Sequence, residues 1–259
     1  MSPIPSARIA GLYRYPVKGL SPEPLPQVAL APGQTLPVDR RYAIENGPSG
    51  FSPADPKYFP KSYFLMLMRN ERLAELQTDF DESNDVLTIR KGGKVAVSGD
   101  LETAAGRAAI EAFFAENFAH ELKGPPKILS GSNHSFSDVA RKVVSIINLG
   151  SVAAIEDTVG QPVDPLRFRA NLYVSGWPAW QELALLDQSL AIGEARLKVV
   201  KRIVRCAAIN VDPQTAARDL NIPPELMRRF GHGDCGVYAE VVAGGSIAAG
   251  DAVTVNPSA

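Results

Sequence analysis

The sequence has few cysteines and no excess of charge of either sign. Cys206 and Cys235 are the two cysteines among 259 residues. Two thiols cannot form a disulfide framework or supply a four-thiolate iron–sulfur cluster. A reduced, cytoplasmic protein is therefore expected. The formal net charge of -1 argues against a general nucleic-acid-binding protein, because such proteins carry a broad basic excess.

Long apolar runs are also missing. No stretch reaches the roughly 18 consecutive apolar residues that a membrane-spanning helix needs. The N-terminal segment 1–19 contains prolines and lacks the apolar centre of a secretory signal peptide. The sequence thus predicts neither a membrane partner nor a nucleic-acid partner. Its length allows one large or two modest domains with a substantial hydrophobic core.

Turns and short strands dominate the first half of the chain. Proline is dense between Pro16 and Pro60, which disfavours helices there. Lys91, Gly92 and Gly93 are typical of a hairpin loop. β-Branched and aromatic residues predict strands at 8–15, 41–46, 86–90 and 94–98.

One longer helix is predicted from about Glu102 to Ala119, because apolar residues recur there at helical intervals. The two prolines that follow Gly124 prevent the helix from continuing further. We expect the apolar residues of this pattern to lie in the core. They are Ile110, Phe113, Phe114 and Phe118.

The second half has many short strands and few helices. A short helix is expected at 151–160, ending at Gly160, and another is expected to begin near Pro223. This pattern predicts a mainly β protein of the α+β class with a barrel-like β domain. The expected strands lie at 142–149, 170–176, 189–193, 195–205, 236–242 and 252–255.

The segment 202–220 is the most informative part of the chain. Cys206 directly follows Arg205 at the end of a basic, strand-like run. A thiol near cations ionises more readily, and the thiolate is the form that attacks electrophiles or binds metals. The alternative is a small buried hydrophobe, which is the usual role of a free cysteine. The local cluster of basic residues suits a small anionic ligand, although each residue could also lie on a solvated strand face. The cluster comprises Arg167, Arg169, Lys201, Arg202 and Arg205.

Several motifs in fixed order resemble a known family. RCAAINVDPQTAARD (205–219), GHGDCGVYAEVV (231–242) and GGSIAAGD (244–251) resemble the MOSC family, the molybdenum-cofactor sulfurase C-terminal domain. LYRYPVKGL (12–20) and VDRRYAIEN (38–46) resemble its N-terminal β-barrel domain. The two-part arrangement is similar to that of the mitochondrial amidoxime-reducing proteins and their bacterial relatives.

The resemblance implies two domains and a cofactor site. The expected domains are an N-terminal β-barrel-like domain at 1–122 and a MOSC β-barrel domain at 123–259, with the first strand, about 8–15, able to pair with the C-terminal barrel. The cofactor is molybdenum–molybdopterin, and the thiolate of Cys206 is its expected protein ligand to the metal, a soft donor beside the dithiolene sulfurs. Guanidinium groups suit the phosphate of the cofactor. The implied cofactor-binding positions are Lys18, Gly19, Arg40, Ser137, Asp138, Arg169, Asn171, Val204, Arg205 and Tyr238.

Some of these positions have a second interpretation. Gly19 and Val204 stand where the eukaryotic pattern has serine, so two hydroxyl contacts to the cofactor are lost. Tyr238 is either a cofactor contact or a half-buried strand tyrosine. Asp212 is a catalytic candidate that could act on substrate or solvent near the metal. An aspartate before proline also commonly accepts backbone hydrogen bonds in a turn, which we favour.

The histidines suggest no strong alternative chemistry. His232, Asp234 and Cys235 could suggest zinc, but they lack a separated fourth ligand. We expect His232 to order a loop near the active site and Cys235 to pack at the start of a strand. A cysteine hydrolase would need a histidine paired with its cysteine, and no catalytic signature surrounds His120, His134 or His232.

The resemblance leads to two functional hypotheses. The first is a molybdenum-dependent oxidoreductase that reduces small N-hydroxylated compounds without pyridoxal phosphate. Its electrons come from a separate ferredoxin, flavoprotein or haem protein. The alternative is a molybdenum-cofactor carrier or a sulfur-transfer protein that holds a persulfide on Cys206.

Overall fold

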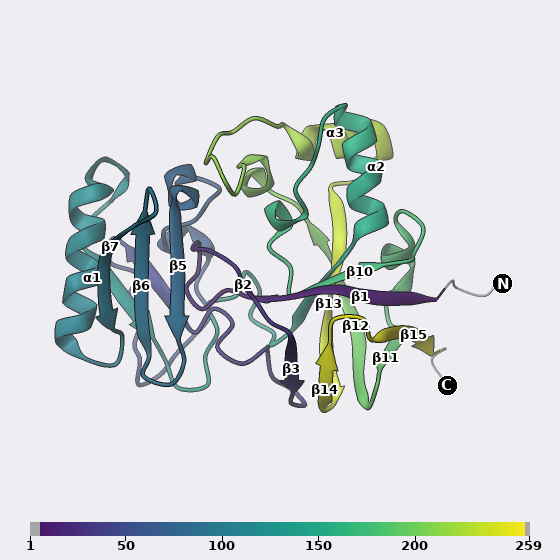
Figure 1. The fold of residues 1–259 in the computed structure, drawn as a ribbon, viewed down its shortest axis with the longest axis horizontal. Coiled ribbons are helices and arrows are strands. Elements are labelled where there is room, and N and C mark those ends of the chain that lie inside the picture. The colour runs from purple at the N-terminus through teal and green to yellow at the C-terminus, as the bar shows by residue number, and fades with distance from the viewer. Residues whose placement is uncertain (1–5, 257–259) are drawn as a thin grey trace.

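The computed structural model describes residues 6–256, which form two lobes side by side (Figure 1). The strands of the C-terminal lobe are β1 (Ala7–Arg14), β2 (Glu23–Pro24), β9 (Val144–Asn148), β10 (Leu172–Ser175), β11 (Ser189–Ile192), β12 (Ala195–Val204), β13 (Asp234–Ala243) and β15 (Ala252–Asn256). They form an eight-stranded sheet in the order β10-β9-β13-β12-β11-β15-β1-β2. An additional pairing between β10 and β1 closes the sheet into a barrel. The predicted mainly β, α+β fold is confirmed.

The first strand of the chain belongs to the C-terminal barrel. β1 pairs antiparallel with both β10 and β15. Ala7, Ile9 and Leu12 are buried in the barrel core. A bulge between Ile9 and Gly11 supplies the extra residue that interrupts strict alternation and still turns Leu12 inward. The next strand, β2, stays beside β1, and residues 27–36 still pack on the barrel core. The chain then forms the N-terminal lobe and returns to the barrel at β9.

Alternating apolar residues fill the barrel. Along β12, Ala195, Leu197 and Val199 are fully buried, whereas Lys198 between them is exposed. Successive side chains of a strand point to opposite faces, so this alternation places one face inside the barrel and the basic residues outside.

Two helices cover one end of the barrel, α2 (Leu149–Val159) and α3 (Ile222–Phe230) (Figure 1). The Asn148 side chain caps α2 by accepting a hydrogen bond from the Gly150 amide at 2.9 Å. Gly160 ends the helix with a left-handed φ of 73°. The predicted helix at 151–160 is thus confirmed, with a start two residues earlier in the chain. A second apolar cluster joins both helices to the barrel.

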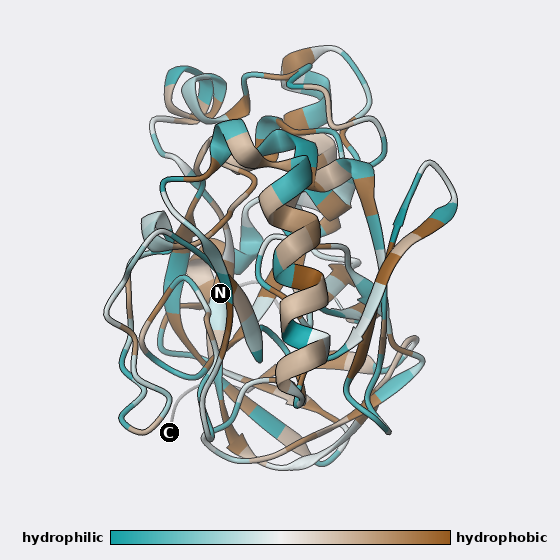
Figure 2. Ribbon diagram, turned by 90° about the vertical axis from the view of Figure 1, so that its left-hand side faces the viewer, coloured by the Kyte–Doolittle hydropathy of each residue, from teal (hydrophilic) through white to brown (hydrophobic). Residues whose placement is uncertain are grey.

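The N-terminal lobe is built from β4 (Tyr42–Asn46), which pairs with β8 (Pro126–Ser130), and from a three-stranded sheet of β5 (Leu76–Asp81), β6 (Val86–Lys91) and β7 (Lys94–Asp100). Gly92 and Gly93 connect β6 to β7 with φ of 58° and 77°. Positive φ at both central residues is characteristic of a two-residue type I′ hairpin turn, so the hairpin loop predicted from the sequence is confirmed. Figure 2 shows α1 (Ala104–Asn117) crossing the near face of this lobe.

Local contacts explain where α1 begins. Thr103 caps the helix by accepting a hydrogen bond from the Gly106 amide at 3.0 Å. Gly106 also approaches the Asp100 carbonyl so closely that a Cβ atom would lie 2.1 Å from its oxygen. The predicted helix is therefore confirmed but is shorter than 102–119 at both ends. Its apolar face reaches the lobe core through Ile110, Phe113 and Phe114.

Several elements had no clear sequence signal. The strands β3 (Gln27–Leu30), β5, β8 and β14 (Gly245–Ala248) were not predicted, and β3 pairs with β14. Within residues 6–256, no helix is long and apolar enough to cross a membrane. The first five residues of the N-terminal segment considered above lie outside the described part. The short 3-10 helices are η1 (Lys61–Tyr63), η2 (Glu71–Glu75), η3 (Ala119–Glu121), η4 (Pro165–Phe168), η5 (Gln181–Leu185) and η6 (Ala207–Asn210).

Candidate functional site

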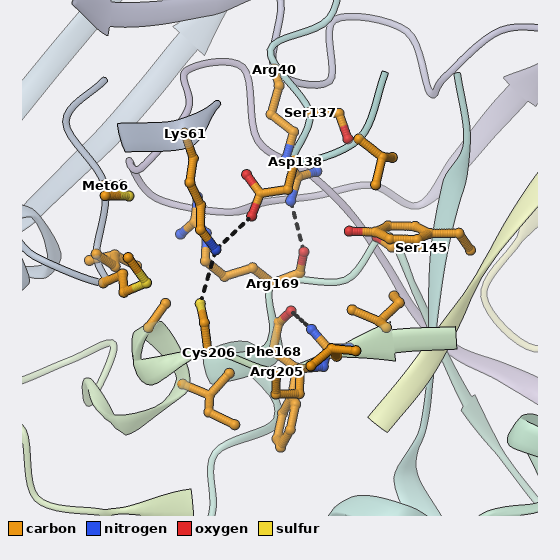
Figure 3. A pocket seen from close by; sticks show the side chains of 18 of the residues that line it. Arg40, Lys61, Met66, Ser137, Asp138, Ser145, Phe168, Arg169, Arg205 and Cys206 are labelled. Carbon is orange, nitrogen blue, oxygen red and sulfur yellow. Dashed lines mark hydrogen bonds and ion pairs between the residues drawn. The ribbon is translucent and has the colours of Figure 1, made fainter. Parts of the chain in front are cut away.

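A cavity of about 280 Å³ lies where the end of β12 meets loops of the N-terminal lobe. Both lobes contribute to its lining (Figure 3). The sequence-predicted residues that the fold brings together there are Lys18, Gly19, Arg40, Ser137, Asp138, Arg169, Asn171, Val204, Arg205, Cys206 and Tyr238. These positions span most of the chain, so the cavity exists only in the folded protein.

Cys206 follows β12 and directly precedes η6. Its side chain is half-buried, and its Sγ accepts a hydrogen bond from Lys61 Nζ at 3.2 Å. Lys61 belongs to η1 of the N-terminal lobe, so a lysine of one lobe contacts the cysteine of the other (Figure 3). Ammonium groups stabilise a neighbouring thiolate. Lys61 lies 145 residues from Cys206 and belongs to no motif, so it was not predicted from the sequence.

Asp138 joins two lysines at the cavity wall. Lys18 is 6% exposed, and its Nζ donates to the Phe136 carbonyl at 2.8 Å and to the Asp138 carboxylate. Lys61 Nζ lies 3.4 Å from the other oxygen of Asp138. Burial acts to raise the pKa of Asp138, but the two ammonium groups outweigh it and hold that pKa well below its usual range. Burial lowers the pKa of Lys18, which Asp138 only partly offsets.

Arg40 and Arg169 lie over the same aromatic ring. Their guanidinium carbons are 4.5 and 4.3 Å from the ring centroid of Tyr15, which is fully buried. Arg40 Nη1 is paired with Asp39, and its Nη2 donates to the Arg169 carbonyl at 2.8 Å. Both arginines have left-handed backbones, with φ of 52° and 51°. Such strain persists where the surrounding structure imposes it, and it clusters at binding sites.

The electrostatics of Arg169 favour an anion. Its Nη2 donates to the Leu20 carbonyl at 2.8 Å, and the carboxylate of Asp39 is already paired with Arg40. Burial, together with the neighbouring Arg40 cation, lowers the pKa of Arg169 to about 10. A bound anion would relieve this unfavourable environment, because an opposite charge favours the protonated form.

Arg205 has one donor without a partner. Its Nε donates to the Cys235 carbonyl at 2.6 Å, and its Nη1 donates to the Phe168 carbonyl at 3.0 Å. Its Nη2 is buried without a hydrogen-bond partner among residues 6–256. Gly236 has a φ of 82°, and a Cβ atom there would lie 2.9 Å from this nitrogen. A buried unpaired donor is costly, so the fold retains an N–H that a ligand could satisfy.

Two of the expected polar residues are committed to the protein itself. Asn171 Oδ1 accepts from the Ser145 amide and hydroxyl at 3.1 and 2.8 Å, and its Nδ2 donates to the Tyr13 carbonyl at 3.1 Å. Arg167 is 3% exposed and forms a bidentate pair with Asp219, with both distances 2.8 Å. Asn171 therefore fastens β1 to β9, and the charge of Arg167 is compensated internally.

Asp212 does not line the cavity described above. Its Oδ1 accepts from the amides of Gln214 and Thr215 at 2.9 and 2.7 Å, and its Oδ2 lies 2.9 Å from Arg167 Nη2. Burial acts to raise the pKa of Asp212, but these backbone hydrogen bonds outweigh it and lower the pKa. The placement supports the turn interpretation that we favour, because the carboxylate is engaged in capping the turn, and the catalytic role of Asp212 stays a prediction.

The possible zinc ligands point in different directions. Cys235 is fully buried in the apolar cluster of α2 and α3, and burial raises the pKa of its thiol to about 12. His232 packs against Trp180 with ring centroids 5.3 Å apart, and its Nδ1 accepts from the Asp234 amide at 3.2 Å. Across residues 6–256, no group of three His, Cys, Asp or Glu side chains is arranged to hold a metal ion by itself.

Two family models together cover most of the chain. The MOSC N-terminal beta barrel domain matches residues 6–121, and the MOSC domain matches residues 130–254. The chain belongs to the MOSC family. No curated protein matches its sequence.

The solved structures that resemble the chain are distant. The YUAD protein from Bacillus subtilis is 14% identical with a TM-score of 0.48, covering 98% of this chain and 97% of that one. YiiM from Geobacillus stearothermophilus is 19% identical with a TM-score of 0.34, covering 44% of this chain and 53% of that one. YiiM from Escherichia coli is 18% identical with a TM-score of 0.34, covering 45% and 55%. At these values none of them bears on function.

MOSC domains are associated with the molybdenum cofactor, and the donor set of this cavity fits such a group. The half-buried thiol of Cys206 is a soft ligand. The nearby carboxylate of Asp39 is paired with Arg40 rather than with Arg169, and within residues 6–256 Arg205 keeps an unpaired N–H. Phosphate and a polar heterocycle would satisfy both.

Some lining residues lacked a clear signal in the sequence. Asp39 lines the cavity, and Tyr15 lies beneath Arg40 and Arg169 without lining it. Both belong to the same motifs as Lys18 and Arg40, so their closeness in the chain could have identified them. Lys61, Met66 and Met68 lie in a segment without a family motif, and only the contact between the two lobes brings them to the cavity.

Proposed function

We propose that the protein is a cytoplasmic molybdenum-cofactor-dependent oxidoreductase that reduces small N-hydroxylated compounds with electrons from a separate donor protein. One observation carries the proposal. The Cys206 thiol lines a cavity in which two arginines can still contact a ligand. Arg169 would be stabilised by an anion, and Arg205 has an N–H that can donate to a hydrogen-bond acceptor. A soft ligand beside anion-binding guanidiniums is the combination that a metal held by a phosphorylated organic cofactor requires.

Each residue has a role that follows from its environment. Cys206 would ligate molybdenum, and the guanidiniums of Arg169 and Arg205 would hold the phosphate and the pterin. Lys18 and Arg40 are already paired with Asp138 and Asp39, so they contribute positive potential and rigidity. When bound, the cofactor supplies two-electron redox chemistry at a single metal.

The reaction balances as R–NHOH + 2 H⁺ + 2 e⁻ → R–NH₂ + H₂O. The N–O bond breaks, nitrogen is reduced and oxygen leaves as water. The electrons come from a ferredoxin, a flavoprotein or a haem protein, which is oxidised. Lys61 Nζ lies 3.2 Å from Cys206 Sγ, and Asp138 raises the pKa of Lys61 against the opposing effect of burial. We expect Lys61 to donate a hydrogen bond to the oxygen that leaves the substrate, which its contact with Cys206 supports.

The test uses protein produced in a host that makes the cofactor. Molybdenum and pterin content are measured first, followed by reduction of benzamidoxime with reduced methyl viologen as the electron source. We expect loaded protein to form benzamidine, and the Cys206→Ser variant to form none. Molybdenum-loaded protein that reduces neither benzamidoxime nor hydroxylamine would contradict the proposal. Sulfane sulfur on Cys206 without reductase activity would instead favour the sulfur-transfer alternative.

A further inference from the structure

The cavity has an apolar side that the cofactor proposal does not use. The N-terminal lobe contributes Met66, Leu67 and Met68 to its lining. Met66 is only 5% exposed, whereas Leu67 and Met68 are half-buried. Figure 3 shows Met66 at the left of the view, whereas Arg205 lies to the lower right of Cys206. We call residues 66–68 the methionine wall.

The methionine wall is a fixed turn. The Met66 amide donates to Asn70 Oδ1 at 3.0 Å, and the Asn70 amide donates to the Met66 carbonyl at 2.9 Å. Asn70 is 4% exposed, and its Nδ2 donates to Glu121 Oε2 at 3.0 Å. Leu67 packs against the core of the N-terminal lobe. The wall is therefore set in place before any ligand binds.

Arg218 ties this wall to the cysteine. Its Nη2 donates to the carbonyls of Leu67 and Met68, both at 2.9 Å, and its Nη1 donates to the Ala207 carbonyl at 3.0 Å. Ala207 directly follows Cys206. The planar guanidinium thus bridges the two lobes with donors in fixed directions. A shorter or less branched side chain could not span the same three carbonyls, so Arg218 sets the width of the cavity between the wall and Cys206.

We propose that the methionine wall is the subsite for the apolar body of the substrate, and that Arg218 is the positioning residue that sets its distance from Cys206. This inference rests on the proposed function. The cations on the other side of the cavity are suited to an anionic cofactor, and Lys61 and Lys201 disfavour a cationic substrate. Methionine side chains adapt to aromatic rings through polarizable sulfur. The wall therefore selects uncharged N-hydroxylated compounds with a flat apolar body over small polar ones.

The test compares two substrates on full-length, cofactor-loaded protein. Met68→Gln and Arg218→Gln should each raise the KM for benzamidoxime about tenfold, because a polar side chain or a loosened wall weakens contact with the phenyl ring. Hydroxylamine lacks an apolar body, so its KM should change less than twofold. Met227→Gln is the matched control, because Met227 lies on α3, is 57% exposed and is outside the cavity lining. An equal change of KM for both substrates, or no change for either, would overturn the inference.

A second readout separates this inference from the proposed function. Saturation-transfer NMR measures binding of benzamidoxime to the same proteins whether or not they reduce it. Binding that is weakened about tenfold by Met68→Gln and unaffected by Met227→Gln supports the wall even if reduction fails. If the Met68→Gln variant reduces benzamidoxime and binds it as tightly as the unaltered protein does, the proposed function is retained. The inference that the methionine wall binds the substrate is then wrong. If Arg218→Gln does not fold, as judged by thermal unfolding, Met68→Gln alone decides the outcome.

Discussion

Cys206 and Cys235 lie close together on the barrel but in opposite environments. Val204 at the end of β12 pairs with Asp234 at the start of β13, so each cysteine is near one of two neighbouring strand ends. Cys206 faces the cavity and meets Lys61. Cys235 faces the apolar cluster under α2 and α3 and is fully buried. The two residues are identical, so the side that each thiol faces, cavity or apolar cluster, decides what it can do.

Arg205 connects the two regions. Its Nε donates to the carbonyl of Cys235, and the same residue precedes Cys206 in the chain. The core-facing cysteine therefore helps to fix the guanidinium on the cavity side through its backbone, without exposing its own side chain. Substitution of Cys206 should therefore change activity, whereas substitution of Cys235 should change stability.

The largest expected effect comes from exchanging the two thiols for hydroxyls. Cys206→Ser should lower reductase activity more than about 100-fold, because a hydroxyl is a harder and less acidic ligand, while leaving thermal unfolding nearly unchanged. Cys235→Ser should keep activity but lose about 1–3 kcal/mol of stability, because it buries a hydroxyl in an apolar cluster. Activity and unfolding measurements on both variants decide this. Equal behaviour in the two assays would break the distinction between the cysteines.

Next in size is the loss of cofactor affinity from the cavity side. Arg169→Ala removes a charge-assisted contact worth about 1.5–3 kcal/mol, which corresponds to roughly ten- to hundredfold weaker binding. Pterin content per protein after dialysis measures this loss, and Lys18→Ala should lower it in the same direction. Arg196→Ala is the control, because Arg196 lies at the far end of β12 and its side chain donates to the nearby carbonyls of Gly193 and Ala195. Unchanged pterin content in both cavity variants would place the cofactor elsewhere.

Alkylation should distinguish the two thiols by about tenfold in rate. In cofactor-free protein, Cys206 is half-buried at a cavity and should react with iodoacetamide, whereas Cys235 should react slowly because burial raises the pKa of its thiol to about 12. Loading with cofactor should protect Cys206 selectively. Mass spectrometry of the two peptides gives both rates. Faster labelling of Cys235 would reverse the assignments.

The smallest effect is a pH-dependent change in stability at the cavity wall. The folded-state pKa of Asp138 is depressed, so its charge contributes stability above the ordinary aspartate range, and this contribution is lost as pH falls through the folded pKa. Asp138→Asn should cost about 1–2 kcal/mol at pH 7, a modest value because its side chain is 45% exposed. Denaturant unfolding at several pH values should show this difference narrowing in acid. If the difference in stability between Asp138→Asn and the unaltered protein grew in acid, the depressed pKa of Asp138 would be contradicted.

Local pattern was sufficient for the strongly periodic elements. The predicted helix at 151–160 and the hairpin at Gly92 and Gly93 occur within a few residues of their expected positions. The strands at β5 and β8 were missed because alternating polar residues and a leading proline weaken their apolar signal, and pairing with β6 and β4 stabilises them instead. Tertiary pairing therefore overrode a weak local preference.

The sequence by itself determined the mainly β class, the MOSC motifs and the residues that gather around Cys206, because motif residues are placed by short stretches of regular backbone. It did not determine which of them are free to act. Only the tertiary structure shows that Asn171 and Asp212 use their polar atoms internally, and that Lys61 and Arg218 join the two lobes at Cys206. The physical reason is that a hydrogen bond between residues far apart in the chain depends on how the lobes pack, which no local pattern encodes.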